Sequence, residues 1–464
     1  MCLRHDDTRV NIDPRAGAAP HRFDPMQTMD ATTAREHAAN SPTPAADAWP
    51  ASVDVAIVGG GIIGVSTAYA LARAGASVAL FEKGAIGCEQ SSRNWGWVRT
   101  LDRDAAEVPL ALRSNQLWGE IQARADVGFR RTGLLYLQEN AADAAAHRHW
   151  LDRNRAAGVD AVLLDREAAL RLLPPSNRRW TGALYSRSDA VAEPALAAPA
   201  IAALARGHGA RLFEHCAVRG VARSGARVSA VETERGPVSA GAVLLAGGGW
   251  SRLFCGNLGI EFPQLKIRGS VLRTTSFDAG LEVAVNGKDF TCRKRADGGY
   301  TVSQFGASMA DLTPDSFRLF RPFLRSWLAS NAFVRLRFGK RFFTELAMPR
   351  RFGSDRPTPF EAHRVLDPVP SARGIRQAWQ RLVDAFPVFG SARIVQSWAG
   401  YIDVTPDLLP VIGAVDALPG FYLASGFSGH GFGIGPAAGE AMADLIAGRP
   451  PRVDLLPFRL ARFG

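Results

Sequence analysis

Features that would define several other classes of protein are absent from this 464-residue chain. Its five cysteines are scattered, odd in number and without CxxC or Cys/His ligand spacing, so neither a disulfide framework nor a zinc site is expected and a reducing cytoplasm fits. The longest apolar runs, such as VLLAGGG at 243–249, fall far short of the ~20 residues that span a bilayer. No transmembrane helix is therefore predicted.

The charge and the first residues also restrict the interpretation. The chain has 55 basic and 44 acidic residues and so a net charge of +11. The basic residues are dispersed and form no motif that recognises the groove of a nucleic acid, so we expect a basic surface and no nucleic-acid partner. Residues 1–52 are rich in Ala, Pro, Asp and Arg, and show no apolar core of a secretory signal. We predict a disordered leader there, with Met26 and Met29 as alternative starts. The rest is long enough for two or three interleaved domains.

A nucleotide fingerprint begins directly after this leader. VDVAIVGGGIIGVSTAYALARAGASVALFEKG at 53–84 predicts a buried strand, a glycine turn, a helix and a second strand. In its G-x-G-x-x-G motif, Gly59 permits the tight turn, Gly61 lets the backbone approach a pyrophosphate, and Gly64 lets the helix lie close to the sheet. Glu82 ends the second strand, where an acid accepts ribose hydroxyls. The fingerprint predicts a dinucleotide but does not decide between NAD and FAD.

Later segments favour FAD, because an NAD domain is normally continuous whereas this chain returns to the nucleotide. A helix-like run at 194–207 and short strands precede AVLLAGGGW at 242–250. Because glycine has no side chain, the glycines of this segment would let the backbone lie close to a planar cofactor. Near the C-terminus follow QSWAGYIDVTPDLLPVIG at 396–413 and the strand FYLASG at 421–426. The glycine-rich loop GFSGHGF at 426–432 then precedes another helix-like run.

These segments resemble the D-amino-acid oxidase superfamily of FAD-dependent amine oxidoreductases, which includes the sarcosine oxidases and D-amino-acid dehydrogenases. The resemblance is carried by the fingerprint with Glu82, EVPLALRSNQLW at 107–118, WAG…TPDLLPVIG at 398–413 and the loop at 426–432. It implies an α/β fold in which a Rossmann-like FAD-binding domain is interleaved with a mixed-sheet α+β substrate domain. The expected FAD-binding parts are 53–100, 190–264 and 393–464, and the expected substrate domain comprises 101–189 and 265–392.

The resemblance implies that a D-amino acid or N-substituted amino acid is oxidised at its C–N bond to an imine, by hydride transfer to flavin N5. The alternatives are a flavoprotein subunit of an electron-transferring complex without independent catalysis, and a pyridine-nucleotide dehydrogenase. The electron acceptor is a quinone, an electron carrier or O2. The lysine that the oxidases use near O2 has no match in GGYTVSQFG at 298–306, which favours a dehydrogenase.

In this superfamily the loop that resembles GFSGHGF passes along the flavin and leads into a helix whose N-terminus faces the pyrimidine ring. Free N–H groups and the helix dipole stabilise the negative charge of the reduced flavin. His430 either donates to that charge or packs under the ring. The expected cofactor-binding residues are Gly59, Gly61, Ile62, Ile63, Gly64, Glu82, Lys83, Ser91, Ser92, Asn94, Val218, Gly247, Gly248, Trp250, Gly429, His430, Gly431 and Phe432.

The substrate carboxylate requires a cation, and arginine suits it because its planar fork binds carboxylates bidentately. The loop SSRNWGWVR at 91–99 lies, by resemblance, between flavin and substrate, and Arg99 falls near the carboxylate-binding arginine of the sarcosine oxidases. Arg99 is the first choice, with a purely structural ion pair as its alternative role. Arg93, Arg268 and Tyr401 are the further candidates for the substrate site.

Two positions depart from the sarcosine oxidases. Monomeric members attach FAD through a cysteine shortly before the TPD-like turn, but that position is Gly400 here, so we predict non-covalent FAD. They also carry a lysine after GHGF, where this chain has Gly433, which places sarcosine in doubt as the substrate.

The stretch 317–352 is densely basic and aromatic. Phe317, Phe320, Leu324 and Trp327 recur at three- and four-residue steps, which predicts one apolar helix face. One interpretation is a helix docked on the sheet with a solvated basic face. The other is contact with an anionic membrane surface at the inner face, or with an acidic electron-accepting partner.

Overall fold

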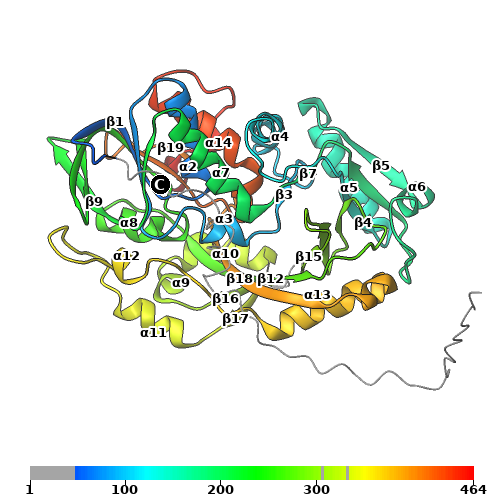
Figure 1. Cartoon of the computed structure of the whole chain (residues 1–464). Helices are drawn as coiled ribbons and strands as arrows, with labels where there is room; N and C mark the ends of the chain where they lie inside the picture. The colour runs from blue at the N-terminus through cyan, green and yellow to red at the C-terminus, as the bar shows by residue number, and fades with distance from the viewer. Residues whose placement is uncertain (1–47, 305–307, 331–333) are drawn as a thin grey trace, which may run out of the picture.

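The computed structural model describes residues 48–304, 308–330 and 334–464, so most of the predicted leader lies outside the described residues. The described chain forms two large sheets with helices packed against them (Figure 1). A third, two-stranded sheet pairs β3 (Trp97–Val98) with β7 (Ala190–Val191). The predicted α/β fold class is confirmed.

The first sheet is built around the fingerprint. Its strand order is β19-β20-β11-β1-β2-β8, and β9 and β10 form an antiparallel extension next to β11. The neighbours from β20 to β8 are parallel, and the carboxyl-terminal halves of β1 and β11 and all of β2 are apolar and buried, as expected for a sheet that is covered on both faces. The strands are β1 (Ser52–Val58), β2 (Val78–Phe81), β8 (Arg211–Phe213), β9 (Val218–Ser224), β10 (Arg227–Thr233), β11 (Gly236–Leu245), β19 (Val411–Ala414) and β20 (Phe421–Ser425).

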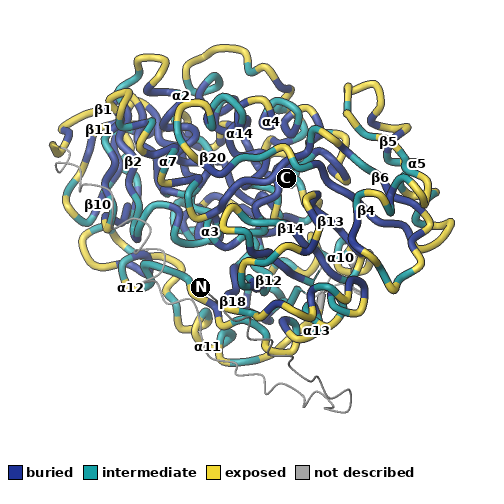
Figure 2. The backbone as a smooth tube through the Cα atoms, turned by 45° about the vertical axis from the view of Figure 1, so that its right-hand side comes forward, coloured by how far each residue is buried: buried dark blue, intermediate teal, exposed yellow. Residues whose placement is uncertain are grey.

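One face of this sheet is covered by α2 (Ile62–Arg73), α7 (Pro194–Gly207) and α14 (Gly431–Ile446), and α4 (Val108–Gln122) packs against α14. Helix α2 lies between α7 and α14, and these segments, far apart in sequence, are seen together in Figure 1. A Cβ on Gly439 would lie 2.6 Å from Ser66 Cβ, so glycine allows α14 to approach α2 closely. Helix α8 (Ser251–Asn257) covers the other face. The tube in Figure 2 is dark blue where these layers meet.

The second sheet has the order β17-β16-β12-β15-β14-β13-β4-β6-β5, and β18 pairs with β12. It is mixed, since β4 and β13 are parallel whereas β12, β14, β15 and β18 run antiparallel to their neighbours. Helix α13 (Ala372–Ala385) packs on it through Ile375, Ala378 and Leu382. The strands are β4 (Leu134–Gln138), β5 (Ala161–Asp165), β6 (Gly182–Ser186), β12 (Leu265–Thr274), β13 (Ala284–Asn286), β14 (Thr291–Lys294), β15 (Tyr300–Ser303), β16 (Ser308–Asp311), β17 (Val334–Arg337) and β18 (Ile394–Val404).

The predicted strands around 133–138, 266–275 and 298–306 correspond to β4, β12 and β15, although 305–307 lie outside the described residues. Strand β18 falls in a range expected for the FAD-binding domain, yet it pairs with β12 over nearly its whole length. The division into domains otherwise stays a prediction. The remaining helices are α3 (Gln90–Arg93), α5 (Ala141–Asn154), α6 (Arg166–Leu170), α9 (Pro314–Arg318), α10 (Phe320–Ser330), α11 (Lys340–Ala347) and α12 (Pro359–Ala362).

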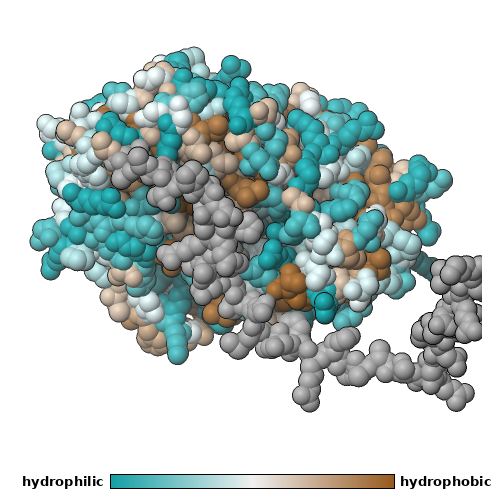
Figure 3. Space-filling model, viewed as in Figure 1, coloured by the Kyte–Doolittle hydropathy of each residue, from teal (hydrophilic) through white to brown (hydrophobic). Residues whose placement is uncertain are grey.

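The apolar stripe predicted in 317–352 is divided between α9 and α10, because α9 ends at Arg318 and α10 begins at Phe320. The interpretation that this stripe is buried against the sheet is wrong. Phe317, Phe320 and Trp327 are 63%, 54% and 41% exposed. The three-residue spacing identified a helix face but not what covers it. In Figure 3, apolar atoms reach the surface at the lower edge of the molecule, in the region of α11.

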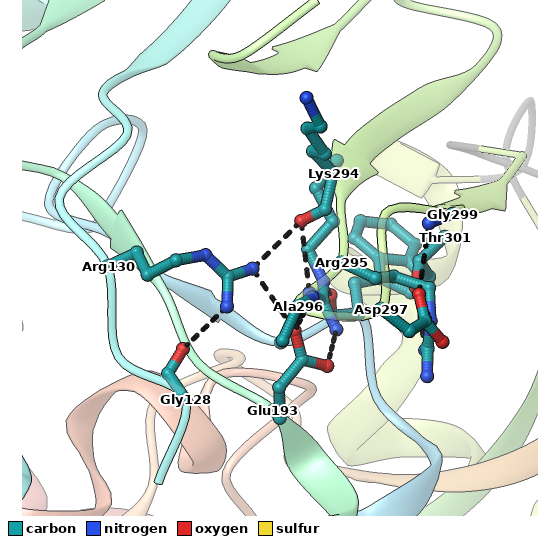
Figure 4. A network of polar contacts seen from close by, with 12 residues as sticks. Gly128, Arg130, Glu193, Lys294, Arg295, Ala296, Asp297, Gly299 and Thr301 are labelled. Carbon is teal, nitrogen blue, oxygen red and sulfur yellow. Dashed lines mark hydrogen bonds and ion pairs between the residues drawn. The ribbon is translucent and has the colours of Figure 1, made fainter. Parts of the chain in front are cut away.

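A buried ion pair joins β14 of the second sheet to the start of α7, which covers the first sheet. Glu193, at the start of α7, accepts two hydrogen bonds from Arg293 of β14, at 2.9 and 3.0 Å. Figure 4 shows Arg130 and the Ala296 N–H donating to the same carboxylate, and Arg130 also donating to the Lys294 carbonyl. Although burial opposes ionisation, the Arg293 guanidinium lowers the pKa of Glu193 to about 2. The guanidinium also donates to the Trp95 carbonyl, so the pair positions the loop before β3.

Candidate active site

The fingerprint turn places the N-terminus of α2 beside a cavity of about 330 Å³. Gly59 has a φ of +109°, and a Cβ there would lie 2.4 Å from the Ala246 carbonyl oxygen, so the turn requires glycine. A Cβ on Gly64 would lie 2.0 Å from the Gly59 carbonyl oxygen, so a side chain at Gly64 would overlap with the backbone of the turn itself. At Gly61 the nearest atom to such a Cβ is Ser91 Oγ, at 3.2 Å, so the cavity side of this residue is open.

Glu82 and Ser91 fix the rim of this turn. The Glu82 carboxylate accepts from Gly60 N and Gly84 N, each at 2.7 Å, and burial raises its pKa. Ser91 Oγ accepts from Ile62 N at 2.9 Å. Both side chains therefore shape the backbone that lines the cavity and also lie at its wall.

The structure brings together most of the residues predicted for the cofactor and the substrate. Gly64 lies behind the turn, and Ser92 instead donates to the Glu89 carbonyl at 3.3 Å. Asn94 also lines the cavity, but its amide bonds to Ser91 O and Gly96 N and so shapes the loop. The predicted residues that line the cavity are Gly59, Gly61, Ile62, Ile63, Glu82, Lys83, Ser91, Asn94, Val218, Gly247, Gly248, Trp250, Gly429, His430, Gly431, Phe432, Arg93, Arg99 and Tyr401.

Sequence reasoning missed a buried polar network at the same wall. Asp403 of β18 is 4% exposed and accepts from Gln90 Nε2 at 2.8 Å, from Gln264 Nε2 at 3.0 Å and from Gly426 N at 2.8 Å. Burial raises the pKa of this carboxyl. The network ties the loop after β20 to β18 and α3. Asp403 lies within the WAG…TPD motif, but the spacing of this motif does not predict which residues form hydrogen bonds with Asp403.

His430 stands immediately before α14 and is held by Glu107, which stands immediately before α4. His430 Nδ1 lies 2.9 Å from Glu107 Oε2 and 3.1 Å from Oε1. Burial raises the pKa of Glu107, but the charges of His430, Arg103 and Arg99 outweigh burial and the pKa is lowered. Burial, followed by the charge of Arg103, lowers the pKa of His430. A neutral ring whose Nδ1–H donates to a carboxylate leaves Nε2 as an acceptor.

The run EVPLALRSNQLW now has a structural account, because three of its side chains hold the start of α14. Besides Glu107, Ser114 Oγ and Trp118 Nε1 donate to the Gly433 carbonyl at 2.7 and 3.0 Å. A Cβ on Gly433 would lie 2.9 Å from the Trp97 carbonyl oxygen, so a lysine side chain has no room at this position without a shift of β3.

The arginines predicted for the carboxylate occupy different environments. Arg99 donates to the Leu101 carbonyl and lies at the cavity wall. Arg93 lines the same cavity, but its guanidinium contacts Asp367 and the Ala399 carbonyl. Arg268 donates to the Val369 carbonyl at 2.9 Å and lines neither this cavity nor the larger one described next.

A larger cavity of about 2090 Å³ adjoins the first one and extends along α8, α9 and α10. The two cavities share a group of lining residues that we call the junction. Three of them are polar groups suited to an amino acid, namely two arginines and a histidine. The junction consists of Trp95, Arg99, Arg103, Trp250, Ile402, Ser428 and His430.

Comparison with known families identifies the class of this chain. The model of the FAD dependent oxidoreductase family, DAO, matches residues 54–445. The chain belongs to the FAD dependent oxidoreductase family. This confirms the resemblance stated from the sequence and FAD as the cofactor, whereas non-covalent attachment stays a prediction.

Similar proteins cover nearly the whole of this FAD dependent oxidoreductase. Glycine oxidase of Geobacillus kaustophilus is 28% identical over 427 residues, covering 88% of this chain and 97% of that protein. Sarcosine oxidase subunit beta of Arthrobacter is 27% identical over 422 residues, covering 89% and 91%. The structure of L-amino acid deaminase from Proteus myxofaciens in complex with anthranilate has a TM-score of 0.87 and 30% identity, covering 90% of this chain and 95% of that one.

The residues present fit FAD. The first turn of α2 contains no acidic side chain, so no carboxylate there competes with a pyrophosphate for the positive helix end. Trp97 Nε1 is buried without a partner among the described residues, and Trp97 lines the smaller cavity. A bound ligand in this cavity can supply the acceptor that such a buried donor normally has. Within the described chain, no helix is long and apolar enough to cross a membrane, and no cluster of three metal-binding side chains occurs.

Proposed function

We propose that this FAD dependent oxidoreductase oxidises the C–N bond of an amino acid to an imine. The observation that carries the proposal is the junction, where arginines and a neutral histidine stand between the cofactor cavity and the larger cavity. The relatives named for glycine, sarcosine and L-amino acids support this substrate class. D-amino acids and N-substituted amino acids are the substrates expected from the sequence. L-amino acids are a second group, favoured by the deaminase structure with a TM-score of 0.87.

Bound FAD supplies the hydride acceptor at flavin N5. The backbone of the α2 N-terminus at Gly61 would hold the pyrophosphate, and Glu82 would accept the ribose hydroxyls. Trp97 Nε1 would donate to the cofactor or to the substrate beside it. The start of α14, fixed by Ser114 and Trp118, would direct its N–H groups at the flavin.

An amino acid arrives as an ammonium ion, and its nitrogen must be neutral before hydride leaves the α-carbon. His430 is the candidate acceptor for that proton, because Glu107 holds its Nδ1–H and leaves Nε2 with a lone pair. The imidazolium formed in this step would be stabilised by the Glu107 carboxylate. His430 thus acts as an acceptor rather than as the donor considered from the sequence.

The substrate carboxylate would be held at the junction by an arginine of the loop between β3 and α4, which carries both Arg99 and Arg103. Tyr401 would close the flavin side of the cavity, with its ring 3.9 Å from the Arg341 guanidinium carbon. Water exclusion is provided by Trp95, Trp250 and Ile402 in the same wall.

We expect a dehydrogenase that passes electrons to a quinone at an anionic membrane surface. The support is an exposed set of apolar residues, which lies on α9, β17 and α11 and includes Phe320, Trp327 and Leu328 of α10. The same segments carry the exposed basic residues Arg318, Arg321, Arg325 and Lys340. Aromatic and basic side chains on one surface suit the boundary between lipid headgroups and acyl chains.

The surface is tested with vesicles. The protein should sediment with phosphatidylglycerol vesicles and less with phosphatidylcholine vesicles, and Phe320→Glu with Phe343→Glu should reduce this binding. Val162→Glu is the matched control, since Val162 is 49% exposed on β5, in another part of the second sheet. Equal sedimentation of both variants would contradict the assignment of this surface.

The function is tested by an anaerobic screen of D-, N-methyl and L-amino acids, in which loss of the visible flavin absorbance marks a substrate. Reoxidation is then compared between O2 and a soluble quinone, and faster reoxidation by quinone is expected. A flavoprotein subunit without its own catalysis, favoured by the similarity to sarcosine oxidase subunit beta, would show no bleaching with any amine until a partner protein is added.

A further inference from the structure

Arg103 was not selected from the sequence, but the structure places it at the centre of the junction. It lies on the loop between β3 and α4, is 4% exposed and lines both cavities. Trp150 Nε1 of α5 donates to the Arg103 carbonyl at 2.8 Å, so α5, which packs on the second sheet, fixes the backbone of this residue. The side chain is therefore held in place without help from its own guanidinium.

The Arg103 guanidinium is buried without a protein partner. Its Nε and Nη1 atoms have no hydrogen-bond partner within the described ranges, and no ion pair of this side chain occurs there. Other arginines with one unpartnered nitrogen use a second one, as Arg268 does with the Val369 carbonyl and Arg341 with Glu345. In the described chain, Arg103 alone leaves two buried nitrogens unsatisfied. Buried donors in native proteins are nearly always paired, so a ligand is the expected partner.

The buried carboxylates near Arg103 form their hydrogen bonds with other residues and none with its guanidinium. Glu107 is the nearest buried carboxylate along the chain, and both of its oxygens contact His430. Asp189 is also buried, but its oxygens accept from Thr100 and Leu101. Burial, and then the charge of Arg99, lowers the pKa of Arg103 to about 10. An anion at this point would relieve the cost of a buried, unpaired cation.

We infer that Arg103 is the direct ligand of the substrate carboxylate. Each two-pronged edge of its guanidinium, Nε with Nη2 and Nη1 with Nη2, includes one of the two unsatisfied nitrogens, and such an edge binds a carboxylate through two charge-assisted hydrogen bonds. Arg99 is then a positioning residue, because its guanidinium donates to the Leu101 carbonyl and fixes the turn that carries Arg103. This inference rests on the proposed function, since it assumes a substrate with a carboxylate.

The test uses the FAD-loaded protein and a carboxylate probe, anthranilate, with its neutral analogue 2-aminobenzamide. Binding is measured by perturbation of the flavin absorbance, so no turnover is required. Arg103→Met keeps the length of the side chain and removes the charged fork. The dissociation constant for anthranilate should rise about ten- to a hundredfold, as expected for loss of charge-assisted hydrogen bonds, while that for the amide stays close to its wild-type value. Arg99→Met is the comparison variant: because Arg99 only positions Arg103, its loss should raise the dissociation constant for anthranilate less than Arg103→Met does.

Each outcome is decisive. Unchanged anthranilate binding in Arg103→Met, or equal losses in Arg103→Met and Arg99→Met, would overturn the inference while leaving the proposed function intact. Wild-type protein that binds no carboxylate and is bleached by no amino acid would refute the proposed function itself. If Arg103→Met fails to retain FAD, Arg103→Lys replaces it, and a selective loss for anthranilate over the amide is again required.

Discussion

Gly61 and Gly64 lie in one turn of the fingerprint, and we predict that added side chains at the two positions fail for different reasons. A Cβ on Gly64 would lie 2.0 Å from the Gly59 carbonyl oxygen, whereas a Cβ on Gly61 would lie 3.2 Å from Ser91 Oγ. The first overlap is with backbone, so the whole turn must move. The second is with a side-chain hydroxyl, which can move by a few tenths of an ångström. We therefore expect a side chain at Gly64 to destabilise the fold, and one at Gly61 to block the cofactor.

The magnitude follows from the overlap. Real Cβ atoms essentially never come within 3.0 Å of another heavy atom, so the alanine at Gly64 must displace the turn by about 1 Å. Overpacking of this kind costs about 1–3 kcal/mol, and a backbone neighbour places Gly64→Ala at the upper value. With an unfolding entropy of about 1 kcal/mol per kelvin for 464 residues, the Tm of the apoprotein should fall by about 3 °C.

The assay combines the flavin-to-protein ratio of the purified variants with thermal unfolding of their FAD-free forms. Gly61→Val should lose flavin but match the Tm of FAD-free wild type. Gly64→Ala should lose flavin and also unfold at lower temperature. Full flavin occupancy in Gly61→Val would refute the close approach of the cofactor to this backbone, and a wild-type Tm in Gly64→Ala would refute the packing argument.

Three further predictions concern the ion pair, the proton acceptor and the cofactor linkage. The folded-state pKa of Glu193 is depressed from 4.5 to about 2, so the ion pair with Arg293 contributes about 3 kcal/mol above pH 4.5, and this is lost as the pH falls toward 2. The stability difference between wild type and Glu193→Gln in urea should therefore narrow below about pH 4.5, and a difference independent of pH would contradict the pairing. The Glu107 carboxylate raises the pKa of His430, so Glu107→Gln should move the acid limb of kcat/KM to lower pH; movement to higher pH would exclude His430 as the acceptor. Acid precipitation should release intact FAD, because Gly400 provides no thiol, and flavin retained in the pellet would disprove non-covalent binding.

The sequence was sufficient for the features that depend on local pattern. The strand-turn-helix at Gly59 and Gly61 and the acid at Glu82 were predicted because each follows from glycine spacing and hydrophobic period. The last helix was also predicted, but α14 begins at Gly431, inside the glycine-rich loop that was expected to precede it. Most of the predicted cofactor residues line one cavity for the same reason.

Features that depend on tertiary pairing were not predictable from one sequence. Arg103 and Arg99 stand four residues apart and look alike in the sequence, and only folding shows that Arg99 meets a carbonyl whereas Arg103 lacks a partner. The network around Asp403 joins segments that are 313 and 139 residues away along the chain. The exposed stripe at Phe317 failed as a buried face because periodicity reports a helix and not its surroundings.

The central claim is that an amino acid held at the junction gives up the hydrogen on its α-carbon. The most direct measurement is anaerobic single-turnover reduction of the flavin by a substrate found in the screen, compared with the same compound deuterated at the α-carbon. The account predicts slower bleaching with deuterium and one imine, recovered as its hydrolysis product, for each flavin reduced. Bleaching at the same rate with no such product, or no bleaching by any amino acid, would contradict it.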